Sequence, residues 1–219
     1  LEFRRVLFRS RQTVLLTGDD APLPPLVYLN VSHDREGAWS IEESEAIAEF
    51  VHSLVTRGKI TRRTGAEGNF VSAAQEEGED PILAPKPDIL IVTPYSAQVE
   101  RIEFALGERM NRPDGVDLRP YVRIQTVDKA QGDEAHVAIY SMVRASVQGA
   151  RHGADFVLSA NRFNVAVSRA RAVAVVIASP RLLDEVPSNA KHVKSLNPLD
   201  RKSTRLNSSH ANISYAVFC

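Results

Sequence analysis

Apolar residues occur along the chain in two alternating patterns. Continuous runs rich in valine and isoleucine are typical of strands buried on both faces, and segments with an apolar residue every three to four positions are typical of helices with one buried stripe. Their alternation predicts an α/β fold, in which a mostly parallel sheet carries helices on both faces. The strands are expected at residues 26–31, 89–92, 122–125, 137–143 and 173–178.

Helices are predicted between these strands. They are expected from residue 40 onwards, at 94–110 and at 161–169. Ser40 followed by Glu43 forms a capping-box pattern, in which each side chain binds a backbone N–H group of the first turn. Residues 58–87 break the regular order, because acidic side chains cluster there among glycines and prolines. We interpret this segment as a polar acidic insertion on the surface.

The two ends of the chain fit neither pattern. Residues 1–10 place arginines among large apolar side chains, and residues 200–219 mix bases, serines and aromatics without a helical or strand period. Both ends resemble the translation of a common short-read sequencing adapter, which matches residues 200–203 in one reading and residues 7–10 in its reverse complement. We therefore expect both ends to be adapter-derived and not native, and one domain at residues 11–199. A pair of natural disordered basic tails is the alternative.

Composition limits the possible functions. The chain has 219 residues, of which 43% are hydrophobic and 25% charged, and this suits one globular domain with its own core. Without the two ends the charge balance is acidic, so nucleic-acid binding would need a local groove and not a basic surface. The only cysteine is Cys219, which leaves the domain without disulfides, thiolate metal sites or a cysteine nucleophile. The chain contains no apolar run of roughly 20 residues, and we expect a cytoplasmic protein without membrane contact.

The first segment that could carry chemistry is Thr-Pro-Tyr-Ser-Ala-Gln at residues 93–98. Ligands of an open α/β sheet gather at the carboxyl ends of its strands, and this segment directly follows the strand at 89–92. Thr93 suits an N-cap and Pro94 the first helical position, so free backbone N–H groups would attract a phosphate here. A capped helix that only packs its apolar stripe into the core is the alternative.

Two further segments contain candidate residues. Thr-Val-Asp-Lys-Ala-Gln-Gly-Asp-Glu at 126–134 offers the amide of Gln131, the carboxylate of Glu134 and, at Gly132, room for close backbone approach. Asn-Arg-Phe-Asn-Val-Ala-Val-Ser-Arg-Ala-Arg at 161–171 places two arginines, Arg162 and Arg169, beside an apolar helical stripe. Such arginines bind phosphate oxygens with charge-assisted bonds, and a pair of surface salt bridges is the alternative.

Taken in this order, the three segments resemble the C-terminal RecA-like domain of superfamily 1 helicases. The resemblance is to the DNA- and RNA-unwinding branch that includes the nonsense-mediated-decay helicase, and it spans residues 26–180. The second and third segments are specific together, whereas the first alone is a weak signal. The resemblance implies an ATP-dependent motor, in which two RecA-like domains enclose ATP and the second closes over the γ-phosphate.

The resemblance also implies roles for individual residues. Arg169 matches the arginine finger, which stabilises the transferring phosphoryl group. Gln131, Gly132 and Glu134 match the motif on the nucleotide side of the cleft, with Glu134 a partner for the ribose, and Arg162 matches an orienting arginine. Residues that match the track of a single nucleic-acid strand are Thr93, Tyr95, Gln98 and Thr126, which would contact the sugar-phosphate backbone without reading bases.

Several parts of the family pattern are missing from this chain. It contains no GxxxxGK[ST] phosphate loop, and Asp-Glu-Ala-His at 133–136 precedes an apolar strand instead of following one, so Asp133 is a poor candidate for a magnesium ligand. The resemblance therefore implies that a first RecA-like domain of the parent chain holds magnesium and most of the ATP contacts, and we expect this chain alone to be inactive. The alternatives are a non-catalytic RecA-like binding or regulatory module, and the motor part of a larger helicase-nuclease.

Overall fold

The computed structural model describes residues 12–19, 21–64, 69–72, 86–146, 160–184, 203–205 and 214–217. Five parallel strands form its centre, in the spatial order β6-β5-β7-β8-β2. They are β2 (Leu26–Asn30), β5 (Ile89–Thr93), β6 (Val122–Thr126), β7 (Ala135–Ser141) and β8 (Ala170–Ala178). Each one overlaps a strand predicted from the apolar runs, and the predicted α/β class is confirmed.

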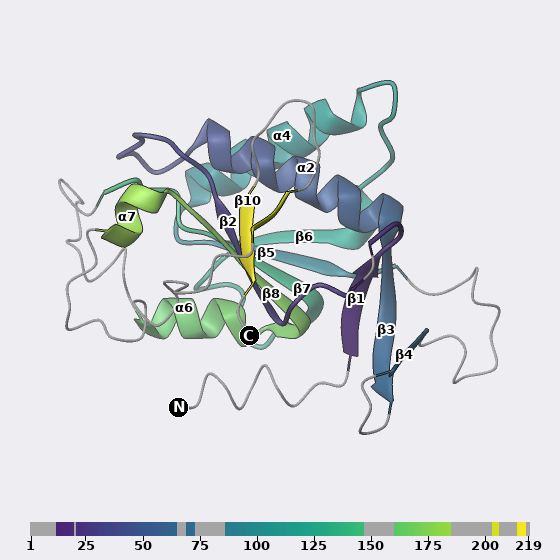
Figure 1. The fold of residues 1–219 in the computed structure, drawn as a ribbon. Coiled ribbons are helices and arrows are strands. Elements are labelled where there is room, and N and C mark those ends of the chain that lie inside the picture. The colour runs from purple at the N-terminus through teal and green to yellow at the C-terminus, as the bar shows by residue number, and fades with distance from the viewer. Residues whose placement is uncertain are drawn as a thin grey trace.

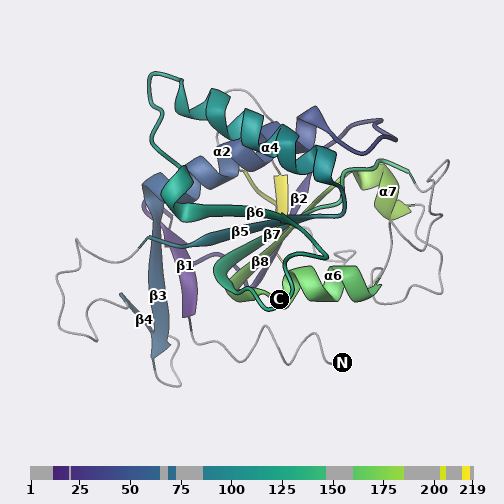
Figure 2. The same ribbon diagram turned by 180° about the vertical axis from the view of Figure 1, so that it is seen from behind.

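Helices cover both faces of this sheet (Figure 1). α2 (Ile41–Arg57) and α4 (Ser96–Met110) lie side by side on one face, and α6 (Ala160–Val167) lies on the other, as the reverse view also shows (Figure 2). Separate buried apolar clusters fill the two interfaces, and each large side chain buried in this way contributes about 1.5–3 kcal/mol. The shorter helices are η2 (Arg119–Tyr121) and α7 (Pro180–Asp184). No helix in the described ranges is long and apolar enough to cross a membrane.

The start of α2 follows the predicted capping box only in part. The Ser40 hydroxyl accepts a hydrogen bond from the Glu43 N–H group at 3.1 Å, as expected of the cap. The Ser40 N–H group, however, donates to the side-chain oxygen of Gln98 at 2.8 Å. Because this partner from α4 replaces the reciprocal bond, the Glu43 carboxylate turns into the interior, where it is fully buried.

The start of α4 lies two residues later than the sequence predicts. Thr93 pairs with Thr126 as the last residue of β5, and its carbonyl accepts a hydrogen bond from the Val127 N–H group at 3.0 Å. The residue before a proline favours extended backbone, so Thr93 continues the strand. Tyr95 occupies the N-cap position instead, without a side-chain cap bond, and the predicted cap at Thr93 is wrong.

A second, antiparallel sheet contains strands that the sequence analysis did not predict (Figure 1). It consists of β1 (Gln12–Leu16), β3 (Gly58–Thr64) and β4 (Asn69–Ser72), in the order β1-β3-β4. Part of the predicted insertion at 58–87 is therefore sheet, since Ile60 of β3 is buried opposite Val14 of β1. The acidic cluster of the insertion lies outside the described residues.

Two short strands also occur in the C-terminal segment, where the sequence showed no strand period. β9 (Ser203–Arg205) and β10 (Ser214–Val217) pair with each other, and β10 pairs antiparallel with β2, so they extend the edge of the main sheet. These two strands were not predicted from the sequence. Without β10 the edge of β2 would present unpaired backbone groups, which can template added strands of varied sequence. The adapter origin of residues 200–219 stays a prediction.

Candidate functional site

Four of the predicted residues lie at the amino ends of strands, although the sequence suggested the carboxyl ends. The loop at 127–134 ends directly before β7, and Arg169 directly precedes β8. These places are neighbours, because β7 and β8 start side by side and the Ala135 N–H group donates to the Arg169 carbonyl at 3.0 Å. We call this group the amino-end cluster, and its members are Gln131, Gly132, Glu134 and Arg169.

The loop at 127–134 crosses the sheet from the end of β6 to the start of β7 without a helix. Val127 and Ala130 anchor this loop, since both side chains are buried in the apolar core between α6 and the sheet. Gly132 has a φ of 95°, in the left-handed region that favours glycine, and a Cβ added there would meet no atom within 4 Å. The backbone at Gly132 is therefore open to a ligand, and the neighbouring Glu134 is exposed.

Arg169 lies in the turn after α6 and not on the helix, because α6 ends at Val167. Its Nε–H group donates to the Val165 carbonyl at 3.0 Å, and its backbone N–H group donates to the Ala166 carbonyl at 3.3 Å. The stem of the side chain is thus fixed, while the two terminal nitrogens have no hydrogen-bond partner within the described ranges. The expectation that the helix extends to residue 169 and carries Arg169 is wrong.

The Asp-Glu-Ala-His sequence at 133–136 makes structural contacts. Asp133 accepts a hydrogen bond from the Gln125 amide at 2.7 Å, and His136 contacts the carboxylate of Asp88 through its ring and, at 2.9 Å, through its backbone N–H group. Arg171 donates to the same carboxylate at 3.1 Å. Burial opposes ionisation of Asp88, but the hydrogen bonds from His136 and the charge of Arg171 outweigh it and lower the pKa of Asp88 well below its usual range. Asp88 therefore ties β5, β7 and β8 together at their amino ends.

The remaining predicted residues gather at the opposite end of the strands. Thr93 and Thr126 are paired at the carboxyl ends of β5 and β6, and Tyr95 follows as the N-cap residue of α4. The Thr93 hydroxyl is buried and has no hydrogen-bond partner in the described structure. We call this group, together with Arg162 from the first turn of α6, the carboxyl-end cluster.

Arg162 belongs with the carboxyl-end cluster and not with the residues expected to face a nucleotide. Burial raises the pKa of the Tyr95 phenol, and the positive charges of Arg144 and Arg162 oppose this rise. Burial likewise raises the pKa of Tyr140, and the charge of Arg162 again opposes the rise. Arg162 therefore lies close to both phenols, and Tyr95 stands beside two guanidinium charges, in surroundings suited to a phosphate.

Gln98 is completely buried, which separates it from the other predicted strand contacts. Its amide oxygen accepts from the Ser40 N–H group at 2.8 Å, and its amide nitrogen donates to the Ser141 hydroxyl at 3.0 Å. Both ends of the amide are thus used inside the protein. Gln98 joins α2, α4 and the end of β7, and the structure gives it no route to a ligand in this conformation.

Sequence reasoning missed the buried polar residues that Gln98 joins. The Glu43 carboxylate lies 3.1 Å from the His33 ring and accepts hydrogen bonds from the Ser141 hydroxyl at 2.6 Å and the Val143 N–H group at 2.9 Å. The capping-box pattern already gave Glu43 a local role, so the sequence offered no reason to look for a partner from β7. A serine at the end of an otherwise apolar run, as at Ser141, was the signal that could have pointed to this network.

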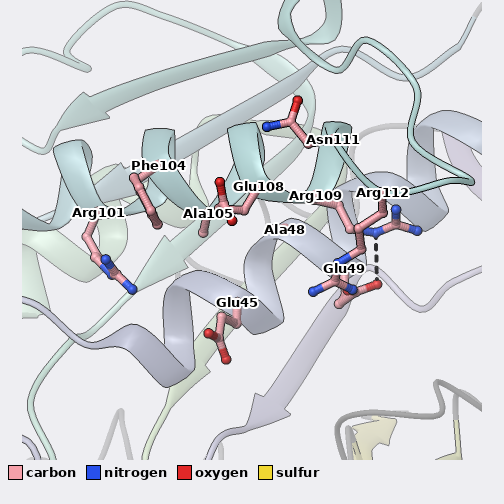
Figure 3. Close-up of a pocket in the computed structure, with 10 residues that line it drawn as sticks. All are labelled: Glu45, Ala48, Glu49, Arg101, Phe104, Ala105, Glu108, Arg109, Asn111 and Arg112. Atoms are coloured by element: carbon pink, nitrogen blue, oxygen red, sulfur yellow. Dashed lines mark hydrogen bonds and ion pairs between the residues drawn. The ribbon is translucent and has the colours of Figure 1, made fainter.

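A groove of about 380 Å³ lies between α2 and α4, away from both clusters (Figure 3). It contains none of the predicted site residues. Arg109 is buried on its floor and is neutralised by Glu49 at 3.1 Å and by Asp114 at 2.8 Å. Its lining residues are Glu45, Ala48, Glu49, Arg101, Phe104, Ala105, Glu108, Arg109, Asn111 and Arg112. The charges on its floor are paired within the protein, so the groove adds nothing to either cluster.

Comparison with known proteins gives relatives of one kind. The DNA polymerase alpha-associated DNA helicase A of Saccharomyces cerevisiae is 27% identical over 151 residues, which are 64% of this chain and 20% of the relative. The probable helicase MAGATAMA 3 of Arabidopsis thaliana is 29% identical over 143 residues, 61% of this chain and 17% of the relative. The RNA helicase Mov10l1 of Homo sapiens is 34% identical over 103 residues, 46% of this chain and 8% of the relative.

The match to a protein family covers most of the chain. The chain spans only 8% to 20% of the length of the three helicases, but a family model described as an AAA domain matches residues 10–181. This range contains the whole parallel sheet of five strands together with both clusters. The chain therefore belongs to this AAA-domain family and is a superfamily 1 helicase domain with a RecA-like α/β fold.

Proposed function

We propose that this chain is the second motor domain of an ATP-dependent superfamily 1 helicase. In this proposal the amino-end cluster closes over the γ-phosphate of ATP held by a first RecA-like domain of the same parent chain, and the carboxyl-end cluster grips one nucleic-acid strand. The observation that carries the proposal is Arg169, whose stem is fixed by the Val165 carbonyl while its terminal nitrogens lack partners in the described structure. A prearranged guanidinium of this kind stabilises charge in a transition state without reorganising.

The residues around Arg169 also fit a nucleotide. The open backbone at Gly132 allows a ligand to approach closely, and the exposed carboxylate of Glu134 can accept hydrogen bonds from ribose hydroxyls. When bound, ATP supplies the phosphoryl group that is transferred to water. We assign the magnesium ion to the first domain, because the family pattern has its metal-holding carboxylates there.

The carboxyl-end cluster suits a single strand that is held by its backbone. Tyr95 provides an aromatic ring and a hydroxyl beside the charges of Arg144 and Arg162, and the hydroxyl groups of Thr93 and Thr126 lie at the neighbouring strand ends. Aromatic rings and backbone contacts hold single strands without reading their sequence. The relatives include proteins named as DNA helicases and as RNA helicases, so both kinds of strand belong in the test.

Strand binding by the 219-residue chain tests this assignment. Fluorescein-labelled oligo(dT) and oligo(rU), each of about 20 nucleotides, are titrated at low salt and followed by anisotropy. We expect Tyr95→Ala to weaken binding by about tenfold, the usual scale for the loss of an aromatic contact. Glu134→Ala, a change at the amino-end cluster, should leave the affinity within about twofold. Equal losses in the two variants, or no binding by the unaltered chain, would reject the proposed strand site.

ATPase activity provides a second arm of the same experiment. Catalysis in this proposal needs the phosphate loop and the metal carboxylates of the first domain together with Arg169, so we expect no ATP hydrolysis by the 219-residue chain, with or without oligonucleotide. Measurable turnover by this chain would contradict its assignment as one half of the motor.

A further inference from the structure

Val143 has an unusual backbone conformation directly after β7. Its φ is 73°, and it is the one non-glycine residue with positive φ within the described ranges. A branched side chain makes this conformation costly, because its Cβ substituents crowd the neighbouring carbonyl oxygen. Such strain persists only where the surroundings hold the residue in place, and strained residues gather at functional sites.

Glu43 is the group that holds Val143. One oxygen of its buried carboxylate accepts both the Val143 N–H group at 2.9 Å and the Ser141 hydroxyl at 2.6 Å. The other oxygen faces the His33 ring nitrogen Nε2 at 3.1 Å. The opposite ring nitrogen, Nδ1, accepts from the Arg35 N–H group at 3.2 Å, so Nε2 carries the proton and donates to Glu43. Both carboxylate oxygens are therefore required as acceptors.

The same network reaches both sides of the carboxyl-end cluster. Through Ser141 it contacts Gln98, which lies in the first turn of α4, three residues after Tyr95. Through Val143 it orients the next residue, Arg144, whose side chain is held by the Ser146 carbonyl at 3.1 Å and by the Glu36 carbonyl. The charge of Arg144 acts on the Tyr95 phenol. The hydrogen bonds of Glu43 thus lead toward Tyr95 from two directions.

We propose that Glu43 is a positioning residue, which holds Val143 in its left-handed conformation and thereby places Arg144 and Tyr95 for contact with a nucleic-acid strand. The part of this inference that concerns strand contact rests on the proposed function. The part that concerns the backbone of residues 142–145 does not depend on it.

Two double variants separate this role from simple packing. Glu43→Leu fills a similar space but accepts no hydrogen bond, so Val143 loses the partner that holds it. Adding Val143→Gly supplies a residue that adopts positive φ without strain, whereas Val143→Ala removes almost the same side-chain volume but keeps a Cβ, which still disfavours positive φ. Only glycine should restore the original backbone.

The experiment uses the 219-residue chain and measures two quantities. The first is hydrogen exchange at the amides of Met142, Arg144 and Ala145, which donate to the carbonyls of Ile177, Met142 and Arg35. The second is affinity for labelled oligo(dT) and oligo(rU). We expect Glu43→Leu to reduce both the exchange protection and the affinity by about tenfold. The double variant with glycine should return to within about threefold of the original chain, and the one with alanine should not.

The outcomes are distinguishable from those of the proposed function. Equal behaviour of the glycine and alanine double variants, or unchanged exchange in Glu43→Leu, overturns the role of Glu43. Absence of strand binding by the unaltered chain overturns the proposed strand site, and hydrogen exchange then still decides whether Glu43 holds Val143. If Glu43→Leu fails to fold, Glu43→Gln is the second background, because its amide keeps the size of Glu43 but offers one acceptor oxygen where both carboxylate oxygens are needed. Its defect should again be rescued by glycine at position 143 and not by alanine.

Discussion

The two ends of the parallel sheet are built in different ways. At the amino ends, Glu134 and Gly132 are exposed on a short loop, and the position of Arg169 depends on a few hydrogen bonds within its own turn. At the carboxyl ends, a buried network from α2, α4 and β7 lies behind Tyr95. The carboxyl end is therefore a preformed surface, whereas the amino end presents groups that need a partner surface to become a site.

Two elements connect these ends. α6 begins near Tyr95 with Arg162 and ends just before Arg169, and its eight residues span about 12 Å. The loop at 127–134 crosses the same face of the sheet in the same sense, from Thr126 to Glu134. A helix and a loop anchored by buried side chains, which both join the two ends, give a physical path by which closure at one end can affect the other.

The largest expected effect comes from Arg169→Ala in the intact parent protein. In the proposed function its guanidinium acts on the transition state, so ATPase activity should fall by roughly 10³-fold or more. Affinity for a single strand should stay within a few-fold, because the carboxyl-end cluster is unchanged. Steady-state ATPase assays and anisotropy titrations of the same preparation measure both quantities.

Arg171→Ala is the matched control for this prediction. Arg171 lies two residues further on, is exposed, and pairs with Asp88. We expect it to lower ATPase activity by no more than a few-fold. Similar losses in the two variants would show that general charge near β8, and not a finger at Arg169, supports the activity.

Gly132→Ala should have a smaller effect that is again confined to the amino end. Space around Gly132 is open, so the cost comes from its φ of 95° alone and should be about 1 kcal/mol of stability. If the backbone there approaches ATP, the KM for ATP in the parent protein should also rise several-fold. Thermal unfolding of the 219-residue chain and ATP titrations of the parent protein measure the two effects.

Gly107→Ala is the control, because this glycine lies within α4 and a Cβ there would also meet no atom within 4 Å. Alanine favours a helix over glycine by up to about 1 kcal/mol, so this variant should be stabilised. Destabilisation of both variants to the same extent would mean that the conformation of Gly132 is not what limits substitution there.

Much of this fold could be predicted because its strands are buried on both faces. Segments such as 89–92 and 172–178 are apolar throughout, and this pattern is local in the sequence. The cap at Ser40 was also predictable, since a cap involves residues only three positions apart. β3 escaped prediction because it is largely polar, and Ile60 is the one large apolar side chain among its seven residues.

The arrangement of the candidate site could be predicted only in part. The residues of the two clusters were found from three short segments, but which end of the sheet each one occupies depends on strand order and on where helices stop. Val167 ends α6 before Arg169, and no local signal marks that boundary. The contact between Glu43 and Val143 joins residues 100 positions apart, and such a pair is invisible to any reading of local pattern.

The smallest expected effect concerns Asp88, which braces the amino end. The pKa of Asp88 is lowered in the folded protein, so its carboxylate stabilises the fold above the unfolded pKa of about 4, and this contribution is lost as the pH falls toward the folded pKa. Asp88→Asn should therefore lower the Tm at pH 7 by at most a few degrees, about the scale of a partly exposed ion pair. The difference from the unaltered chain should shrink between pH 5 and pH 3.

Asp128→Asn, which changes an exposed carboxylate in the loop before Gly132, is the control and should change the Tm less than Asp88→Asn does. Hydrogen exchange in Asp88→Asn should rise at the amides of His136 and Val137, which donate to the Asp88 side chain and carbonyl, and not at those of residues 142–145. Loosening at both ends would mean that the sheet transmits the loss of Asp88. In that case the amino and carboxyl ends would form one cooperative unit. The distinction between an amino end that needs a partner surface and a preformed carboxyl end would not hold.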